Sequence, residues 1–167
     1  KKDKADDIQT NKWLKYYESV NHLSISIDAR KSQNSKLILK KAEELSKQYP
    51  KTFIPNQFEN EANAKAHFET TGPEIWKDTE GKVDIFVAGV GTGGTLTGTA
   101  KYLKEQNSKI QVVAVEPIDS PVLSQGKRGA HPLQGIGAGF IPSVLDTTLY
   151  DSIMTVSGEE AYEASKE

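Results

Sequence analysis

The stretch VDIFVAGVGTGGTLTG, residues 83–98, decides the fold of this chain. It opens with an apolar run rich in β-branched and aromatic residues, which is typical of a strand buried on both faces. A glycine-dense turn follows, and a helical pattern then covers residues 96–106, with Leu96, Ala100 and Leu103 on one side. The stretch therefore predicts a buried strand, a tight turn and the start of a helix.

A glycine turn at the N-terminus of a helix is typical of an anion site. The N–H groups of the turn point at the ligand, and the helix dipole adds positive potential. Glycines leave the backbone open to a phosphate and permit positive φ angles. An ordinary tight turn remains the alternative. The adjacent glycines and flanking threonines favour a phosphate site made of Gly91, Thr92, Gly93, Gly94 and Thr95.

A second buried strand is predicted over residues 110–117. A strand, a helix and a strand in this order form a βαβ unit, whose two strands are parallel and joined by a right-handed crossover. Ligands of such sheets bind beyond the carboxyl ends of the strands, so we expect residues 91–95 and Glu116 at the same rim. The expected fold class is α/β, with an open, mostly parallel sheet and helices on both faces.

The flanking segments extend this pattern. Helices are expected over residues 35–49, which precede Pro50, and over residues 61–71, which Gly72 and Pro73 should end. Residues 119–132 are expected to be a loop. A further strand is expected over residues 150–156, followed by a helix whose Ser157 and Glu160 have capping-box spacing.

Residues 1–34 stay an unassigned N-terminal segment, and residues 35–167 form the predicted α/β domain. Within the N-terminal segment, apolar spacing favours an amphipathic helix over residues 11–20. Alternating apolar and polar residues favour a strand over residues 23–27.

Composition excludes several classes of function. The 167 residues carry a net charge of −2, with 36% hydrophobic and 26% charged residues, so no strong field favours nucleic acid or an anionic membrane. The absence of cysteine excludes disulfides, thiolate metal sites and a cysteine nucleophile. The three histidines lack metal-ligand spacing and read as surface or packing residues. We expect a cytoplasmic enzyme, or a fragment of one, without a metal.

A P-loop and an NAD site are two nucleotide-binding hypotheses to be weighed against a simple phosphate site. The sequence argues against a P-loop, because no Gly-Lys-Ser/Thr follows the glycines. Gly89, Gly91 and Gly94 do satisfy G-x-G-x-x-G, and Glu116 ends the next strand where a ribose-binding acid is expected. Against an NAD site, that fingerprint normally belongs to the first strand of its domain, whereas several elements come first here. The NAD-binding alternative stays open.

Several long segments, in the same order, resemble cysteine synthase, the O-acetylserine sulfhydrylase family of fold type II pyridoxal-phosphate enzymes. The likeness covers about residues 41–157, and its most specific segments are residues 53–60, 70–76, 83–98, 115–124 and 134–142. It implies that the chain is part of the larger, cofactor-phosphate domain of such an enzyme.

The resemblance also implies roles for residues. Residues 91–95 would bind the phosphate of pyridoxal 5'-phosphate. Gln57 would help to hold the carboxylate of a small amino-acid substrate, and the backbone of Gly135, Ile136 and Gly137 would approach the cofactor and substrate. In the family's reaction, acetate leaves O-acetylserine and sulfide adds to give cysteine.

Three motifs of that family are absent from this sequence: the Ser-x-Lys-Asp-Arg-like segment with the cofactor-attaching lysine, the Ser-Gly-Asn-Thr-Gly loop, and the Gly-x-Ser-Ser-Gly segment. No lysine here lies in a family context, so we nominate no catalytic residue. We expect a truncated or rearranged form with little activity alone. The alternative is a non-catalytic module that binds pyridoxal phosphate through its phosphate or serves in subunit interaction. As protein partners we expect a second copy of the chain, in a homodimer, or a full-length family member.

Overall fold

The structure is a computed structural model that describes residues 35–49 and 54–166. The chain divides into two units, Lys1–Glu44 and Leu45–Glu167. Helix α2 (Ser35–Gln48) confirms the helix predicted before Pro50. The helix predicted over residues 11–20 and the strand predicted over residues 23–27 lie outside the described residues.

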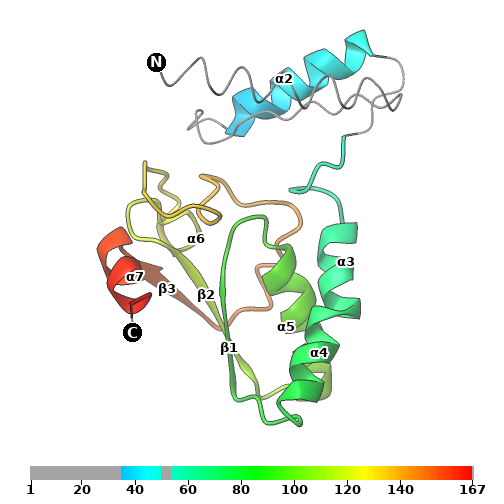
Figure 1. The fold of residues 1–167 in the computed structure, drawn as a ribbon, viewed down its shortest axis with the longest axis vertical. Coiled ribbons are helices and arrows are strands. Elements are labelled where there is room, and N and C mark those ends of the chain that lie inside the picture. Colours follow the sequence, from blue (N-terminus) through cyan, green and yellow to red (C-terminus); the bar gives the residue numbers. More distant parts are fainter. Residues whose placement is uncertain (1–34, 50–53, 167) are drawn as a thin grey trace. The chain divides into compact units, whose positions relative to one another are not determined.

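Within the described residues, three parallel strands form the sheet, as predicted for the α/β class. They are β1 (Ile85–Gly89), β2 (Gln111–Pro117) and β3 (Ser152–Val156), adjacent in that order (Figure 1). Val87 pairs with Val113, and Val115 pairs with Met154. Because the strands run in one direction, their carboxyl ends lie at one rim, where the glycine turn leaves β1.

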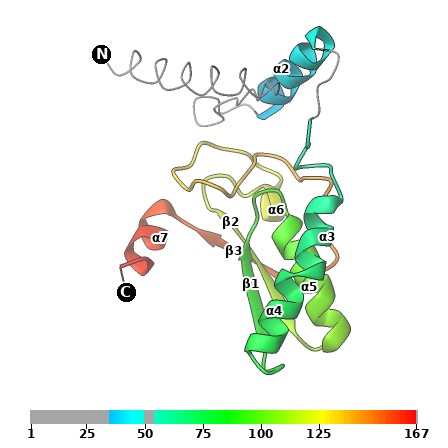
Figure 2. The ribbon, with the colours of Figure 1, turned by 45° about the vertical axis from the view of Figure 1, so that its right-hand side comes forward.

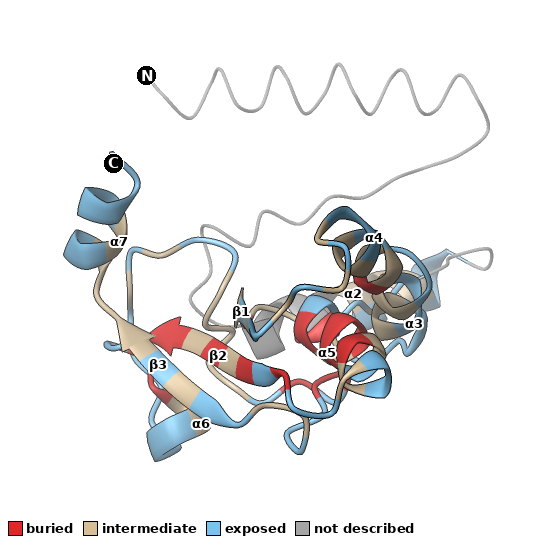
Figure 3. Cartoon of the chain, turned by 90° about the horizontal axis from the view of Figure 1, so that it is seen from below, coloured by how far each residue is buried: buried red, intermediate tan, exposed pale blue. Residues whose placement is uncertain are grey.

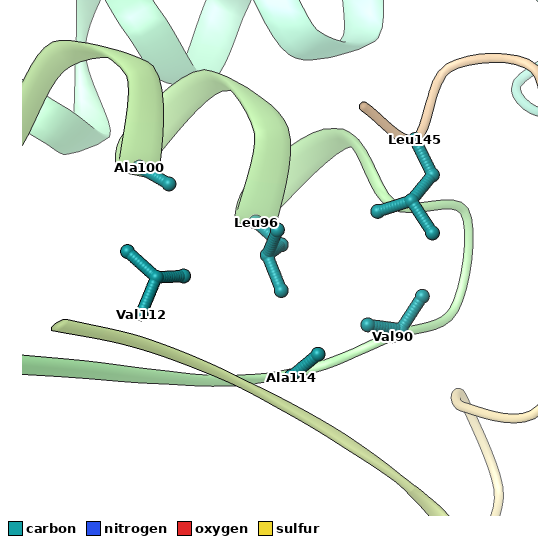
Figure 4. Packing of buried hydrophobic residues seen from close by; sticks show 6 residues of the cluster. All are labelled: Val90, Leu96, Ala100, Val112, Ala114 and Leu145. Carbon is teal, nitrogen blue, oxygen red and sulfur yellow. The ribbon is translucent and has the colours of Figure 1, made fainter. Parts of the chain in front are cut away.

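The core lies between the sheet and helix α5 (Gly94–Gln106), which connects β1 to β2. Figure 4 shows Leu96 and Ala100 of α5 facing Val112 and Ala114 of β2, with Val90 and Leu145 beside them. Leu96, Ala100 and Leu103 are each fully buried, which confirms the predicted apolar side of the helix. Helices α3 (Ala62–Glu69) and α4 (Thr71–Asp78) pack against α5 on the side away from the sheet (Figures 1 and 2).

The other face of the sheet corrects the prediction that β1 is buried on both faces. Ile85 is 56% exposed, Val87 55% and Met154 of β3 53%. In Figure 3 the buried residues concentrate on α5 and β2. The described helices α3, α4 and α5 form their layers on one side, so every second residue of β1 faces outward without a covering helix.

Three local expectations have different outcomes. Gly72 and Pro73 do not end a helical region, because they lie in the first turn of α4. N–H groups in a first turn have no partner within the helix, so the missing N–H of proline costs no hydrogen bond there. Residues 119–132 contain a short helix, α6 (Val122–Gln125). Helix α7 (Gly158–Ala164) begins with the predicted capping box between Ser157 and Glu160.

Asp151 connects the start of β3 to both the neighbouring strand and α5. Its Oδ2 accepts hydrogen bonds from Lys104 Nζ at 2.8 Å and from the Val112 N–H at 2.7 Å. The bond from Lys104 and then the bond from Val112 lower the pKa of Asp151 from its ordinary value of 3.8. The carboxylate form is therefore favoured by folding.

We expect this group to contribute to acid unfolding. Because its pKa is lower in the folded chain, the unfolded chain takes up the proton first as the pH falls. The stabilisation is present above pH 3.8 and is lost as the pH falls through the lowered pKa. Urea unfolding at several acidic pH values should show a flatter pH dependence for Asp151→Asn than for the wild type. Equal slopes for the two proteins would contradict this assignment.

Candidate functional site

The turn between β1 and α5 is short and held at both ends. The Val90 N–H donates to the Val115 carbonyl at 2.9 Å, which continues the pairing of β1 with β2. The Val90 carbonyl accepts from the Gly137 N–H at 2.9 Å. At the other end, the Thr97 N–H donates to the Gly93 carbonyl at 2.9 Å and starts the helix. The residues between these bonds form a fixed turn at the rim of the sheet.

The turn presents N–H groups without acceptors. Among the described residues, no protein acceptor faces the N–H of Gly91, Thr92, Gly93, Thr95 or Leu96. The Gly94 N–H makes only a 3.3 Å bond, to Thr92 Oγ1. Free N–H groups at a helix N-terminus, where the helix dipole is positive, suit an anion. An anion with several acceptor oxygens is the ligand that this geometry fits best.

The glycines of the turn leave no room for side chains. Gly93 has a φ of +85°, which glycine adopts at little energetic cost, and a Cβ there would lie 2.6 Å from Leu145 Cβ. A Cβ on Gly91 would collide with the Gly135 carbonyl oxygen, and one on Gly94 would collide with Asn63 Oδ1. The glycines thus serve close packing behind the turn as well as access in front of it.

The second glycine-rich segment lies directly against this turn. The Gly137 N–H bonds to Val90, and a Cβ on Gly89 would lie 2.8 Å from Ile136 Cγ2. The structure therefore brings Gly135, Ile136 and Gly137 to the predicted phosphate turn. The close backbone approach expected from the alternating glycines is to the β1–α5 turn itself. Whether these residues contact a substrate stays a prediction.

Helix α3 contributes two polar residues that sequence reasoning missed. Asn63 Nδ2 donates to Thr92 Oγ1 at 2.9 Å, and His67 Nε2 lies 3.1 Å from Thr95 Oγ1. His67 Nδ1 lies 2.9 Å from Thr71 Oγ1. Asn63 and His67 are four residues apart, on one face of α3. That spacing was the available signal, but it gains meaning only once α3 is known to pack on α5.

Gln57 lies close to the same site. Its backbone carbonyl accepts a hydrogen bond from Asn63 Nδ2 at 2.8 Å, so one side chain joins this loop to the glycine turn. Gln57 is exposed, and its carboxamide makes no hydrogen bond within the described residues. The carboxamide is free to bind a ligand at the rim, and its role in holding a substrate carboxylate stays a prediction.

Glu116 lies at the carboxyl end of β2 as predicted, but its carboxylate is buried and hydrogen-bonded there. It is 2% exposed and accepts hydrogen bonds from the Leu123 N–H at 2.7 Å, from the Ser124 N–H at 3.0 Å and from Ser124 Oγ at 2.5 Å. Burial, with a smaller contribution from the Glu116 charge, raises the pKa of Tyr150. A carboxylate that caps α6 in this way is not available to a ribose, which removes the main support for an NAD site.

The described part of the chain was searched for metal-ligand groups and for membrane-spanning helices. It contains no group of three or more histidine, aspartate or glutamate side chains placed to hold a metal ion. None of its helices is both long and apolar enough to cross a membrane.

Comparison with known proteins identifies the family. Residues 23–167 match the family model described as pyridoxal-phosphate dependent enzyme, and the chain belongs to that family. The match includes residues 23–34, which sequence reasoning left unassigned.

Curated relatives are cysteine synthases. The chain is 54% identical over 125 residues to the cysteine synthase of Flavobacterium sp. strain K3-15, and this match covers 75% of this chain and 41% of the relative. It is 49% identical over 137 residues to cysteine synthase A of Escherichia coli K12, and this match covers 77% of this chain and 42% of the relative. The chain thus spans less than half of the length of these relatives.

Solved structures agree with the predicted fold. A hydrogen sulfide-producing enzyme from Fusobacterium nucleatum superposes with a TM-score of 0.72 at 50% identity, over 75% of this chain and 42% of that one. Cysteine synthase from Entamoeba histolytica superposes with a TM-score of 0.73 at 41% identity, over 77% of this chain and 38% of that one. The parallel sheet and its helices are therefore those of a type II pyridoxal-phosphate enzyme.

Proposed function

We propose that this chain provides the cofactor-phosphate part of a cysteine synthase, with residues 91–95 as the phosphate site. The observation that carries the proposal is the set of unpaired N–H groups where α5 begins. A phosphate has only acceptor oxygens at neutral pH and is stabilised by such donors and by the helix dipole. When bound, pyridoxal phosphate supplies an electron sink for chemistry at an amino-acid substrate.

The remaining residues near the turn are suited to orienting a substrate. The exposed Gln57 carboxamide has both donors and an acceptor, so it can hold a carboxylate without adding charge. Gly135 lies behind Gly91 and is itself exposed, so a flat ligand can approach its backbone. The proposal includes the small amino-acid substrate and the cytoplasmic location expected from the sequence.

The proposal extends to activity. No lysine in the sequence lies in the motif that attaches the cofactor in this family, and general acid–base chemistry at the substrate depends on such an amine. We expect the purified 167-residue chain to form little or no cysteine from O-acetylserine and sulfide. A turnover rate typical of full-length cysteine synthases would refute this part of the proposal.

Cofactor binding tests the site directly. Equilibrium dialysis of the purified chain should show pyridoxal 5'-phosphate bound at least about tenfold more tightly than pyridoxal, because charge-assisted hydrogen bonds to phosphate contribute about 1.5–3 kcal/mol each. Inorganic phosphate should compete with pyridoxal 5'-phosphate, and NAD should not. Equal affinity for pyridoxal and its phosphate would show that the turn is not a phosphate site.

A second candidate function is that of a subunit-interaction module. The observation that favours it is the exposed apolar sheet face of Ile85, Val87 and Met154. Apolar side chains gathered on an uncovered face are typical of an interface. The module could form a homodimer or join a full-length family member. Mixing the chain with a full-length cysteine synthase and measuring particle mass by light scattering would detect either assembly, and two unchanged monodisperse peaks would argue against it.

A further inference from the structure

We propose that Asn63 is a positioning residue that makes the Thr92 hydroxyl a hydrogen-bond donor toward a phosphate at the glycine turn. The inference rests on the proposed phosphate site. It states that a residue of α3 determines whether a hydroxyl of that site donates or accepts a hydrogen bond. It begins from the bond between Asn63 Nδ2 and Thr92 Oγ1, which joins residues 29 positions apart in sequence.

The orientation of the Asn63 carboxamide is fixed by its neighbours. Its Nδ2 donates to the Gln57 carbonyl at 2.8 Å as well as to Thr92 Oγ1 at 2.9 Å. A carbonyl oxygen can only accept, so the amide nitrogen and not the amide oxygen must face Gln57. On its other side, Asn63 Oδ1 fills the space where a Gly94 side chain would begin. The carboxamide therefore has one orientation, with both N–H bonds in use.

This orientation decides what Thr92 can do. Thr92 Oγ1 accepts from Asn63 Nδ2 and, at 3.3 Å, from the Gly94 N–H. A hydroxyl oxygen has two lone pairs and one proton, so with both lone pairs engaged its remaining capacity is to donate. Thr92 lies between the unpaired N–H groups of Gly91 and Gly93. Its proton thus joins a row of donors of the kind that a phosphate oxygen accepts.

The second threonine of the turn lacks this fixed polarity. Thr95 Oγ1 lies 3.1 Å from His67 Nε2, and an imidazole nitrogen can either donate or accept depending on the tautomer. An amide nitrogen has no such choice. The same helix therefore holds both threonines, but only Asn63 fixes the direction of the hydrogen bond.

Binding measurements on the full 167-residue chain test the inference. We expect Asn63→Ala and Thr92→Val each to lower the affinity for pyridoxal 5'-phosphate by about tenfold and to leave the affinity for pyridoxal unchanged. The double variant should be about as weak as either single variant, because both remove the same donated bond. Asn63→Asp should bind pyridoxal 5'-phosphate more weakly than Asn63→Ala does, since a carboxylate accepts the Thr92 proton and repels the phosphate.

The Ala and Asp substitutions separate positioning from packing. Aspartate has nearly the shape of asparagine, so a role in packing alone predicts that Asn63→Asp is the milder change. Thr92→Ser keeps the hydroxyl and should retain nearly full affinity. Asn60→Ala is the matched control, because Asn60 bonds the Pro55 carbonyl and the Ala62 N–H and does not contact the glycine turn. It should leave the preference for the phosphate form unchanged.

Two failures are distinguishable. Circular dichroism identifies any variant that does not fold, and the near-isosteric Asn63→Asp and Thr92→Ser still decide the question if Asn63→Ala is such a case. Equal wild-type affinity for pyridoxal and its phosphate overturns the phosphate site and the inference together. A wild type that prefers the phosphate form, with Asn63→Asp unaffected or with additive losses in the double variant, overturns the inference alone.

Discussion

Gly91→Ala is expected to remove phosphate binding and to lower the free energy of unfolding by about 3 kcal/mol, near the upper end for overpacking. The added Cβ would collide with the carbonyl oxygen of Gly135, and backbone on both sides of that contact is held by the bond between Val90 and Gly137. Neither segment can move without disturbing the turn. Urea unfolding measures the stability, and equilibrium dialysis with pyridoxal 5'-phosphate measures the site.

Gly126→Ala is the matched control. Gly126 has a φ of +65° but open space where a Cβ would lie. An alanine there meets backbone strain alone, for which we expect a loss of about 1 kcal/mol and no change in phosphate binding. If the two alanine variants lose stability equally, close packing between the two glycine segments is not what the glycine at 91 provides.

Glu116→Ala is expected to lower the free energy of unfolding by about 4 kcal/mol. The buried carboxylate accepts three hydrogen bonds, two from N–H groups of α6 and one from Ser124 Oγ. Removing it leaves buried donors without acceptors, and each unsatisfied donor costs about 1–3 kcal/mol. Urea unfolding measures the change.

Glu116→Gln is the comparison for this site. The amide keeps one acceptor oxygen and turns an NH₂ group toward another donor, so we expect a loss of about 2 kcal/mol, smaller than for alanine. A ribose-binding acid at the rim would instead be free in the unbound chain. Wild-type stability for both variants would restore that reading and contradict the capping role.

The sequence predicted those parts of the fold that depend on local periodicity. The apolar side of α5 and the positions of β1 and β2 follow from patterns that the core enforces, as the full burial of Leu96 and Leu103 shows. The exposure of Ile85 and Val87 could not be predicted, because an apolar run does not say which of its faces has a covering layer.

The candidate site was predictable where a motif is contiguous. Residues 91–95 carry their own signal, since glycines and threonines are adjacent in sequence. Asn63 was not found, because its partners Gln57 and Thr92 lie on different segments that only the packing of α3 on α5 brings together. Glu116 was placed at the correct strand end, but α6, which its carboxylate caps, was not foreseen in a segment with few apolar residues.

The strand order has a consequence for handling the protein in solution. With the order β1-β2-β3, the outer strands β1 and β3 each present one row of backbone groups that pairs with no other described strand. Neither Ile85–Gly89 nor Ser152–Val156 contains a charged residue that would discourage another chain from adding there. Purified chain held at high concentration is therefore expected to self-associate by strand addition, and lysines introduced on these two margins should suppress it.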